Sequence, residues 1–379
     1  MQFSQVVAQE EIKEYFIHSD KQNRMPHAML FLGATGYGTL AMANALAQYI
    51  LCDHKTETDS CGQCNQCRKV DRFIHPDVHY TFPTIGSKMT SGDFLPQWRK
   101  FVSHGLYQDV QDWYRCLDGE NKQGNITKDE CDRILKVLSL KSYEGSHKIM
   151  IIWMAEFLGD QGNRLLKILE EPPENTVFIL LAESQEAILN TILSRCQIIP
   201  FKPIEYPVLQ EYLQDHAKLD KDSAMQMAFL ARGNVQTALS LAQQNNDKVA
   251  GLWLDWLRLA YKGYGLEINP WVDQFAKLNR ESQKAFMYYG LHFLREMLLF
   301  HLNPGHDIHL LEKEKLAMSK MSSLLTHQSI EGMILLIEEN IFHIERNINS
   351  KILLLDSSIR MHYLLHNQEA SLKALLSTS

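Results

Sequence analysis

The chain has 379 residues and a mass of 43.8 kDa, which predicts two or three domains with a substantial hydrophobic core. Hydrophobic residues make up 45% and charged residues 22%, which excludes intrinsic disorder, collagen and a disulfide-packed miniprotein. The formal net charge of −7 argues against DNA binding through a broad basic face. Because neither a signal-peptide pattern nor a bilayer-spanning apolar run is visible, we expect a cytoplasmic protein without membrane partners.

Residues 1–202 predict an α/β core. Five short apolar runs are the strand candidates, and helical patterns at 40–51 and 163–170 separate some of them: Met29–Leu32, Val78–Phe82, Ile149–Trp153, Val177–Leu181 and Ile198–Ile199. Continuous apolar strands that alternate with helices predict a parallel sheet covered on both faces. Residues 84–124 are polar and contain glycines, so we interpret them as an insertion with irregular parts.

The remainder of the chain predicts only helices. Residues 203–245 indicate a small helical unit, whose last helix spans 235–243 after the break at Gly233-Asn234. In residues 246–379, apolar positions recur three or four apart over 252–261, 281–300, 330–347 and 350–366. Pro270 and Asn303-Pro304-Gly305 are the expected breaks between these helices.

A glycine-rich turn follows the first predicted strand. Gly33, Gly36 and Gly38 stand where a phosphate-binding loop would lie, between a strand and the start of a helix. Thr39 occupies the position of the loop lysine and Leu40 that of the metal-binding Ser or Thr. The backbone amides could still bind a phosphate weakly, or the turn could only join the strand to the helix.

The strand that ends near residue 152 also lacks the residues of a working ATPase. Acidic side chains that hold the metal ion would follow this strand, but Trp153 and Met154 stand there and the nearest acid is Glu156. Both losses indicate a degenerate nucleotide site, and we predict that the chain does not hydrolyse ATP by itself.

Four cysteines have the spacing of a metal site. Cys61, Cys64 and Cys67 are three residues apart, and Cys52 precedes them at the end of a predicted helix. Four thiolates close a tetrahedral site without an open position, which predicts structural Zn²⁺ in a module at 52–67. The alternatives are an iron–sulfur cluster, whose pattern continues with a further cysteine and proline that are missing here, and free thiols.

Arg195 lies in Ser194-Arg195-Cys196, between a predicted helix and the last strand. One interpretation is an ordinary surface charge. The other is an arginine finger, a guanidinium that stabilises charge on a nucleotide bound by a neighbouring subunit.

Taken in order, these motifs resemble the delta-prime family of bacterial DNA polymerase III clamp-loader subunits, within the AAA+ superfamily. The resemblance spans residues 5 to about 243 and is thin in the helical C-terminal part. Besides the glycine turn and the four cysteines, the matching residues are Pro26-His27-Ala28, His75-Pro76-Asp77, Leu165–Pro173 and Ser194-Arg195-Cys196.

The resemblance implies three domains: an AAA+ core at 1–202, a three-helix lid at 203–245 and a helical collar for oligomerisation at 246–379. It implies a non-hydrolysing stator subunit that supports ATP-dependent loading of a sliding clamp on primed DNA, as a component of the DNA polymerase III holoenzyme. The implied partners are motor (gamma/tau) and delta subunits and, through the complex, the clamp and the DNA. Arg195, with Ser194, would complete the ATP site of a neighbouring motor subunit, and Cys52, Cys61, Cys64 and Cys67 would bind zinc.

Two other functions stay open at this stage. The first is an active AAA+ motor subunit of the clamp loader, although Thr39 replaces the lysine and Gln236 replaces an arginine of the family's lid motif. The second is a separate zinc-dependent DNA-binding module, which the net charge of −7 disfavours.

Overall fold

The structure is a computed structural model that describes residues 1–86, 88–117, 119, 124–243, 246–263, 265–278, 280–303, 305, 308, 310, 312–346 and 348–368. The chain divides into two compact units. The first contains 1–209 and 233–237, and the second contains 210–232 and 238–379. Among the described residues, no helix combines the length and the apolar composition needed to cross a membrane.

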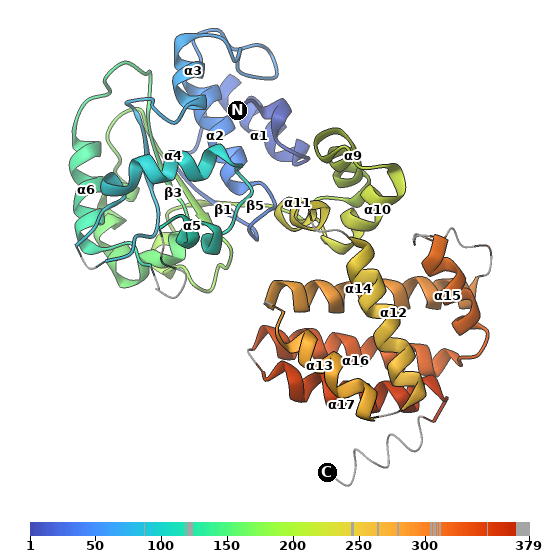
Figure 1. Cartoon of the computed structure of the whole chain (residues 1–379). Coiled ribbons are helices and arrows are strands. Elements are labelled where there is room, and N and C mark those ends of the chain that lie inside the picture. The colour runs from blue at the N-terminus through green and yellow to red at the C-terminus, as the bar shows by residue number, and fades with distance from the viewer. Residues whose placement is uncertain are drawn as a thin grey trace. The chain divides into compact units, whose positions relative to one another are not determined.

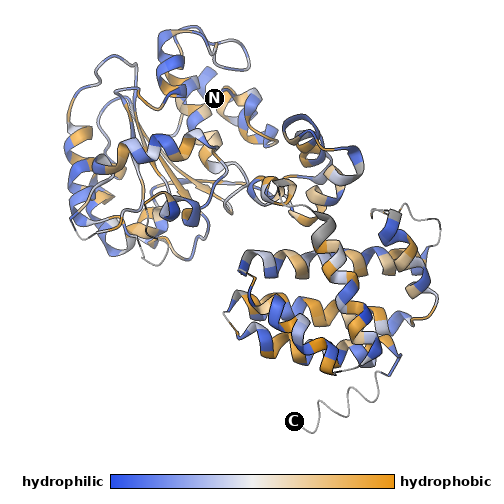
Figure 2. Cartoon of the chain, viewed as in Figure 1, coloured by the Kyte–Doolittle hydropathy of each residue, from blue (hydrophilic) through white to orange (hydrophobic). Residues whose placement is uncertain are grey.

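A five-stranded parallel sheet forms the centre of the first unit, in the order β2-β3-β4-β1-β5 (Figure 1). All five predicted strands are present, with bounds that differ from the predicted ones by one or two residues: β1 (Ala28–Leu32), β2 (Val78–Thr81), β3 (Lys148–Ile152), β4 (Thr176–Ala182) and β5 (Gln197–Pro200). Residues of β1, β3 and β4 are almost completely buried, and Figure 2 shows these strands as largely hydrophobic. The predicted α/β core with a parallel sheet between helices is therefore confirmed.

Helices cover both faces of the sheet, as continuous apolar strands require. On one face, Leu30, Met150 and Phe178 belong to a buried cluster that includes residues of α6, η3, α7 and α8. On the other face, Phe16 of α1 contacts Phe31 of β1, with ring centroids 5.6 Å apart. The helices of this part are η1 (Phe3–Gln5), α1 (Glu10–Lys21), α2 (Thr39–Leu51), α3 (Asn65–Asp71), η2 (Ser91–Phe94), α4 (Leu95–Ser103), α5 (Val110–Cys116), α6 (Lys128–Ser139), η3 (Ala155–Leu165), α7 (Leu166–Glu170) and α8 (Asn190–Leu193).

The region at 84–124 is more ordered than predicted. It contains η2, α4 and α5, and its fully buried Trp98, Phe101 and Trp113 pack together. Trp98 stacks on Phe82 just after β2, with centroids 4.3 Å apart, and contacts Trp153 just after β3 at 5.3 Å. The described part of this region is therefore folded onto the carboxyl ends of two strands.

The predicted helix at 163–170 is wrong in its first turn. Residues 155–165 form the 3-10 stretch η3, which is kinked at Gly159, and the α-helix α7 starts only at Leu166. Gly159 has a φ of 45°, a left-handed conformation that interrupts a regular helix and suits glycine.

The region predicted as a small helical unit contains α9 (Tyr206–Ala217), α10 (Lys221–Leu230) and α11 (Val235–Gln243). The predicted boundary at residue 245 lies outside the described residues. The helices that follow are α12 (Asn246–Lys262), α13 (Gly265–Ala276), α14 (Arg280–Leu302), α15 (Glu312–Ser322), α16 (His327–Glu345) and α17 (Ser350–Leu365).

Trp253 and Trp256 of α12 are fully buried in the second unit. Trp253 packs so closely on Gly290 of α14 that a Cβ there would lie 2.2 Å from the indole ring. Trp256 donates a hydrogen bond from Nε1 to Ser358 Oγ of α17, at 2.9 Å. In the part of the C-terminal region that the structure describes, helices are the only regular elements, as predicted.

The predicted break at Pro270 is wrong, because Pro270 lies inside α13. A proline removes one helical hydrogen bond, here the one to the carbonyl of Leu266. Leu266 is 90% exposed, so water can reach that carbonyl and the cost is small enough for the buried Val272 and Phe275 to hold the helix in place.

Candidate functional sites: the glycine loop, the cysteine cluster and Arg195

The glycine turn joins β1 to α2, as predicted. Gly36 and Gly38 have φ values of 88° and 96°, and Gly38 directly precedes the first turn of α2. A Cβ on Gly36 would lie 2.0 Å from Oδ1 of Asn234, so backbone angle and close contact both require glycine here. Thr39 and Leu40, which replace the lysine and the hydroxyl residue of a working loop, are both buried.

Polar groups of the same unit bind the turn. The backbone N–H of Thr35 donates to Glu183 Oε1 at 2.7 Å, and the Thr35 hydroxyl bonds to the same carboxylate. Asn234 Nδ2 donates to the carbonyl of Thr35 at 2.6 Å, and the N–H of Val235 donates to that of Gly36 at 3.1 Å. A carboxylate therefore stands at an amide of the loop, where a phosphate oxygen would otherwise accept.

Little space remains beside the turn. The cavity there has a volume of about 10 Å³ and is lined by, among others, Tyr107, Trp153, Met154 and Glu183. A volume of about 10–15 Å³ is needed for a single water molecule, so a triphosphate does not fit without rearrangement. Tyr107 comes from the region at 84–124, and its hydroxyl accepts a hydrogen bond from the N–H of Val7 at 2.9 Å.

Glu156, the acid nearest to the end of β3, does not bond to the turn. Its Oε1 accepts from the backbone N–H groups of Glu183 and Ser184, and burial raises the pKa of its carboxyl. Gln236 donates from Nε2 to Asp112 Oδ2 of α5 at 2.8 Å.

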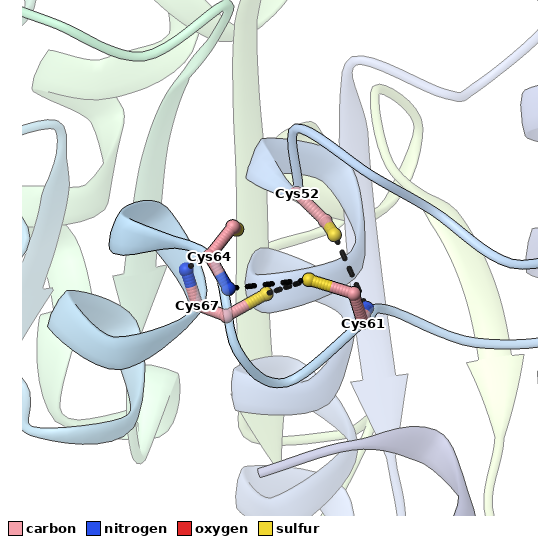
Figure 3. A group of neighbouring side chains, drawn as sticks. All are labelled: Cys52, Cys61, Cys64 and Cys67. Atoms are coloured by element: carbon pink, nitrogen blue, oxygen red, sulfur yellow. Dashed lines mark hydrogen bonds between the residues drawn. The ribbon is translucent and has the colours of Figure 1, made fainter.

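The four predicted ligand cysteines lie together (Figure 3). Cys52 directly follows α2, Cys64 directly precedes α3, and Cys67 lies in the first turn of α3. All four Sγ atoms are within 4.8 Å of one another, and Cys61 Sγ lies 3.9 Å from Cys67 Sγ. Zn–S bonds of about 2.3 Å place tetrahedral sulfur atoms about 3.8 Å apart, so this donor set fits zinc.

Backbone N–H groups point at the sulfur atoms of Cys52, Cys61 and Cys64. The N–H groups of Gln63 and Cys64 point at Cys61 Sγ and lower the pKa of that thiol to about 6. Burial instead raises the pKa of Cys52 and of the fully buried Cys67. A zinc ion held by these residues would tie the end of α2 to the start of α3 and leave no open position for catalysis.

The His75-Pro76-Asp77 motif connects the cysteine module to the sheet. His75 Nε2 lies 2.7 Å from Oε1 of Gln66, a residue between two of the cysteines. The carboxylate of Asp77 accepts hydrogen bonds from the N–H groups of Tyr143, Glu144 and Gly145, at 2.6, 2.9 and 2.7 Å. Burial would raise the pKa of Asp77, but these three bonds outweigh it and hold the pKa below its usual value.

Arg195 lies at the turn between α8 and β5, with about 30% of its side chain exposed. Its Nε and Nη2 donate to Glu170 Oε2, at 3.2 and 3.0 Å, and its Nη1 donates to the carbonyl of Thr191 at 2.9 Å. The Ser194 hydroxyl lies 3.2 Å from Nη1 and donates to the same Thr191 carbonyl at 3.1 Å. The guanidinium is therefore fixed at the surface by its own chain.

Comparison with known proteins supports the family assignment. A family model described as "DNA polymerase III, delta subunit" matches residues 8–205, more than half of the chain. The chain belongs to this family. The match covers the sheet, the glycine turn, the cysteine cluster and Arg195.

Two relatives that match nine tenths of the chain are named as delta' subunits. The DNA polymerase III subunit delta' of Bacillus subtilis (strain 168) is 25% identical over 353 residues, covering 90% of this chain and 92% of the relative. The delta' subunit of Escherichia coli (strain K12) is 25% identical over 359 residues, 93% of each chain. The tau/gamma subunit of Haemophilus influenzae is 26% identical over 248 residues, 64% of this chain and 30% of that protein. The resemblance to the delta-prime family is thus confirmed.

Sequence reasoning did not assign several residues that the structure brings to these sites. Glu183 and Asn234 reach the turn from 148 and 199 residues away, and no local pattern marks them. Glu170 lies in the family motif Leu165–Pro173, but the sequence does not indicate that its carboxylate pairs with Arg195.

Proposed function

We propose that the chain is a non-hydrolysing delta-prime (stator) subunit of the DNA polymerase III clamp loader, and that Arg195 serves as an arginine finger for a neighbouring motor subunit. Its partners would be the gamma/tau and delta subunits and, through the complex, the sliding clamp and primed DNA in the cytoplasm. The three-part division into a core (1–202), a lid (203–245) and a collar (246–379) belongs to this proposal.

The observation that carries the non-hydrolysing role is the carboxylate of Glu183 at the glycine turn. A phosphate there would meet a negative charge, with no lysine at Thr39 to offset it and no hydroxyl at Leu40 to hold Mg²⁺. The small cavity beside the turn supports the same conclusion. These features weigh against the active motor subunit, the alternative function.

Arg195 is well suited to act in trans. It lies at the surface, and an arginine presents several N–H donors in one plane, a geometry that matches phosphate oxygens. Arginine fingers accelerate phosphoryl transfer by roughly 10³–10⁵ where measured.

Reconstitution with the motor and delta subunits tests the finger. We expect Arg195→Ala to leave assembly intact and to lower ATP turnover at the site that it completes by a factor of roughly 10³. Arg164→Ala is the matched control, because Arg164 also forms an ion pair at the surface, with Asp132 at 2.8 Å. The proposal would be contradicted if the Arg195→Ala complex turned over ATP as fast as the parent complex, or if the isolated chain hydrolysed ATP.

A further inference from the structure

From the contacts around Arg195, we propose that Glu170 is a positioning residue that holds the guanidinium in the orientation in which it meets the neighbour's nucleotide. This inference rests on the proposed function, since it concerns how the finger is prepared before the subunits meet. Glu170 itself contacts neither nucleotide nor Mg²⁺ in this role.

The contacts define the orientation of the guanidinium closely. Oε2 of Glu170 accepts hydrogen bonds from both Nε and Nη2 of Arg195. Nη1 donates to the Thr191 carbonyl and to the Ser194 hydroxyl. All three nitrogen atoms therefore have a partner from the chain itself. An arginine has five N–H donors and these contacts use four of them, so one N–H group of Nη2 remains for an incoming phosphate.

The position of Glu170 in the fold is not explained by helix stability. Glu170 is the last residue of α7, and a carboxylate at a helix C-terminus is unfavourable beside the helix dipole. The Glu170 side chain is 61% exposed, so it does not contribute to stability through burial either. Its pairing with Arg195 is the one interaction that the described structure gives its carboxylate.

The end of α7 is itself held in place. His27 Nε2 lies 3.1 Å from the carbonyl of Leu169, and Leu169 is fully buried in the core under the sheet. His27 precedes β1, whose first residues bond to β4. The carboxylate of Glu170 is thus anchored to the sheet, and through it so is the guanidinium of Arg195.

Pre-organisation of this kind raises the rate because a free arginine side chain must be ordered in the transition state. An exposed arginine–carboxylate pair is a modest interaction, so the effect is small beside that of the finger itself. We expect Glu170→Ala to lower kcat for ATP in the reconstituted complex about three- to fivefold. Glu170→Gln retains a neutral acceptor of the same shape and should lie between this variant and the parent.

The experiment compares steady-state ATP turnover of complexes that contain the parent, Glu170→Ala, Glu170→Gln, Arg195→Ala or the Arg195→Ala/Glu170→Ala double variant. Glu171→Ala is the matched control, because Glu171 is the next residue and its exposed side chain has no hydrogen-bond partner among the described residues, while its backbone N–H, which the substitution keeps, donates to the Lys167 carbonyl. We expect kcat to fall with little change in the KM for ATP, and thermal unfolding of the chain to be unaltered. In the Arg195→Ala background, Glu170→Ala should have no additional effect.

The outcomes separate this inference from the proposed function. If Arg195→Ala leaves turnover unchanged, the finger itself is refuted. If Arg195→Ala slows turnover while Glu170→Ala equals the parent or exceeds it, only the positioning role is refuted. An equal loss from Glu170→Ala with and without Arg195 would also refute it, because the carboxylate would then act independently of the guanidinium.

Discussion

The hydrogen bonds of Asp77 give a quantitative prediction for the family motif His75-Pro76-Asp77. Asp77 is 2% exposed, and its two carboxylate oxygens accept three backbone N–H groups from the loop that precedes β3. Oδ1 accepts the hydrogen bond from the N–H of Tyr143, and Oδ2 accepts those from the N–H groups of Glu144 and Gly145. We therefore expect Asp77→Asn to weaken the attachment of this loop at Tyr143, Glu144 and Gly145.

The size of the effect follows from those three bonds. An asparagine can place its single oxygen towards Glu144 and Gly145, but its NH₂ group then faces the N–H of Tyr143. One charge-assisted bond is lost and two become neutral, and hydrogen bonds to charged groups contribute about 1.5–3 kcal/mol against about 1 kcal/mol for neutral ones. We expect the free energy of unfolding of this unit to fall by at least about 2.5 kcal/mol.

Urea unfolding and amide hydrogen exchange measure this change. The amides of Tyr143, Glu144 and Gly145 should exchange at least about tenfold faster in the variant, since 1.4 kcal/mol corresponds to a factor of ten. Asp160→Asn is the control, because Asp160 is an exposed aspartate of the same unit, and it should change stability by less than about 0.5 kcal/mol.

The pH dependence gives a second readout. Because the pKa of Asp77 is lowered in the folded chain, its contribution is present above the unfolded value of about 3.9 and is lost as the pH falls through the folded pKa. The stability difference between parent and Asp77→Asn should therefore shrink in acid. If the variant is as stable as the parent at pH 7, or if exchange of the three amides does not change, the carboxylate does not anchor the loop.

Two further predictions concern the cysteine cluster and the aromatic cluster. Elemental analysis of the purified chain should find about one zinc, and Cys64→Ser should lose it because three thiolates leave the tetrahedral site incomplete; iron, or an empty parent site, would contradict the assignment. Trp98→Ala should lower the free energy of unfolding by about 3–5 kcal/mol in urea titrations, because Trp98 is fully buried among aromatic rings. Tyr143→Ala, at a position that is 83% exposed, is its control, and similar losses for both variants would contradict this reasoning.

The parts of the fold that the sequence predicted are those with a local signal. Strands buried on both faces are continuous apolar runs, so β1, β3 and β4 could be identified individually. The cysteine cluster could be predicted for the same reason, because its ligands lie within sixteen consecutive residues, 52–67, at a spacing that metal chemistry dictates.

The missed parts depend on distant contacts. The region at 84–124 seemed irregular because its helices are short, and Trp98 and Trp113 are held by packing on Phe82 and Trp153 rather than by a helical repeat. Pro270 seemed a break because a proline costs a helical hydrogen bond, but Leu266, whose carbonyl loses that bond, is an exposed residue, and this reduces the cost. Composition and periodicity contain neither piece of information.

Contacts within the chain hold the glycine turn in its shape. Gly36 is needed by the present structure, because its positive φ and the contact with Asn234 both exclude a side chain. The turn's carbonyls at Thr35 and Gly36 accept hydrogen bonds from Asn234 and Val235, and its amide at Thr35 donates to Glu183. In a motor subunit such contacts would compete with the binding of the nucleotide in each cycle. Here these contacts are made within the chain, and neither a lysine nor a metal-binding hydroxyl takes part in them, which is consistent with the non-hydrolysing role that we propose.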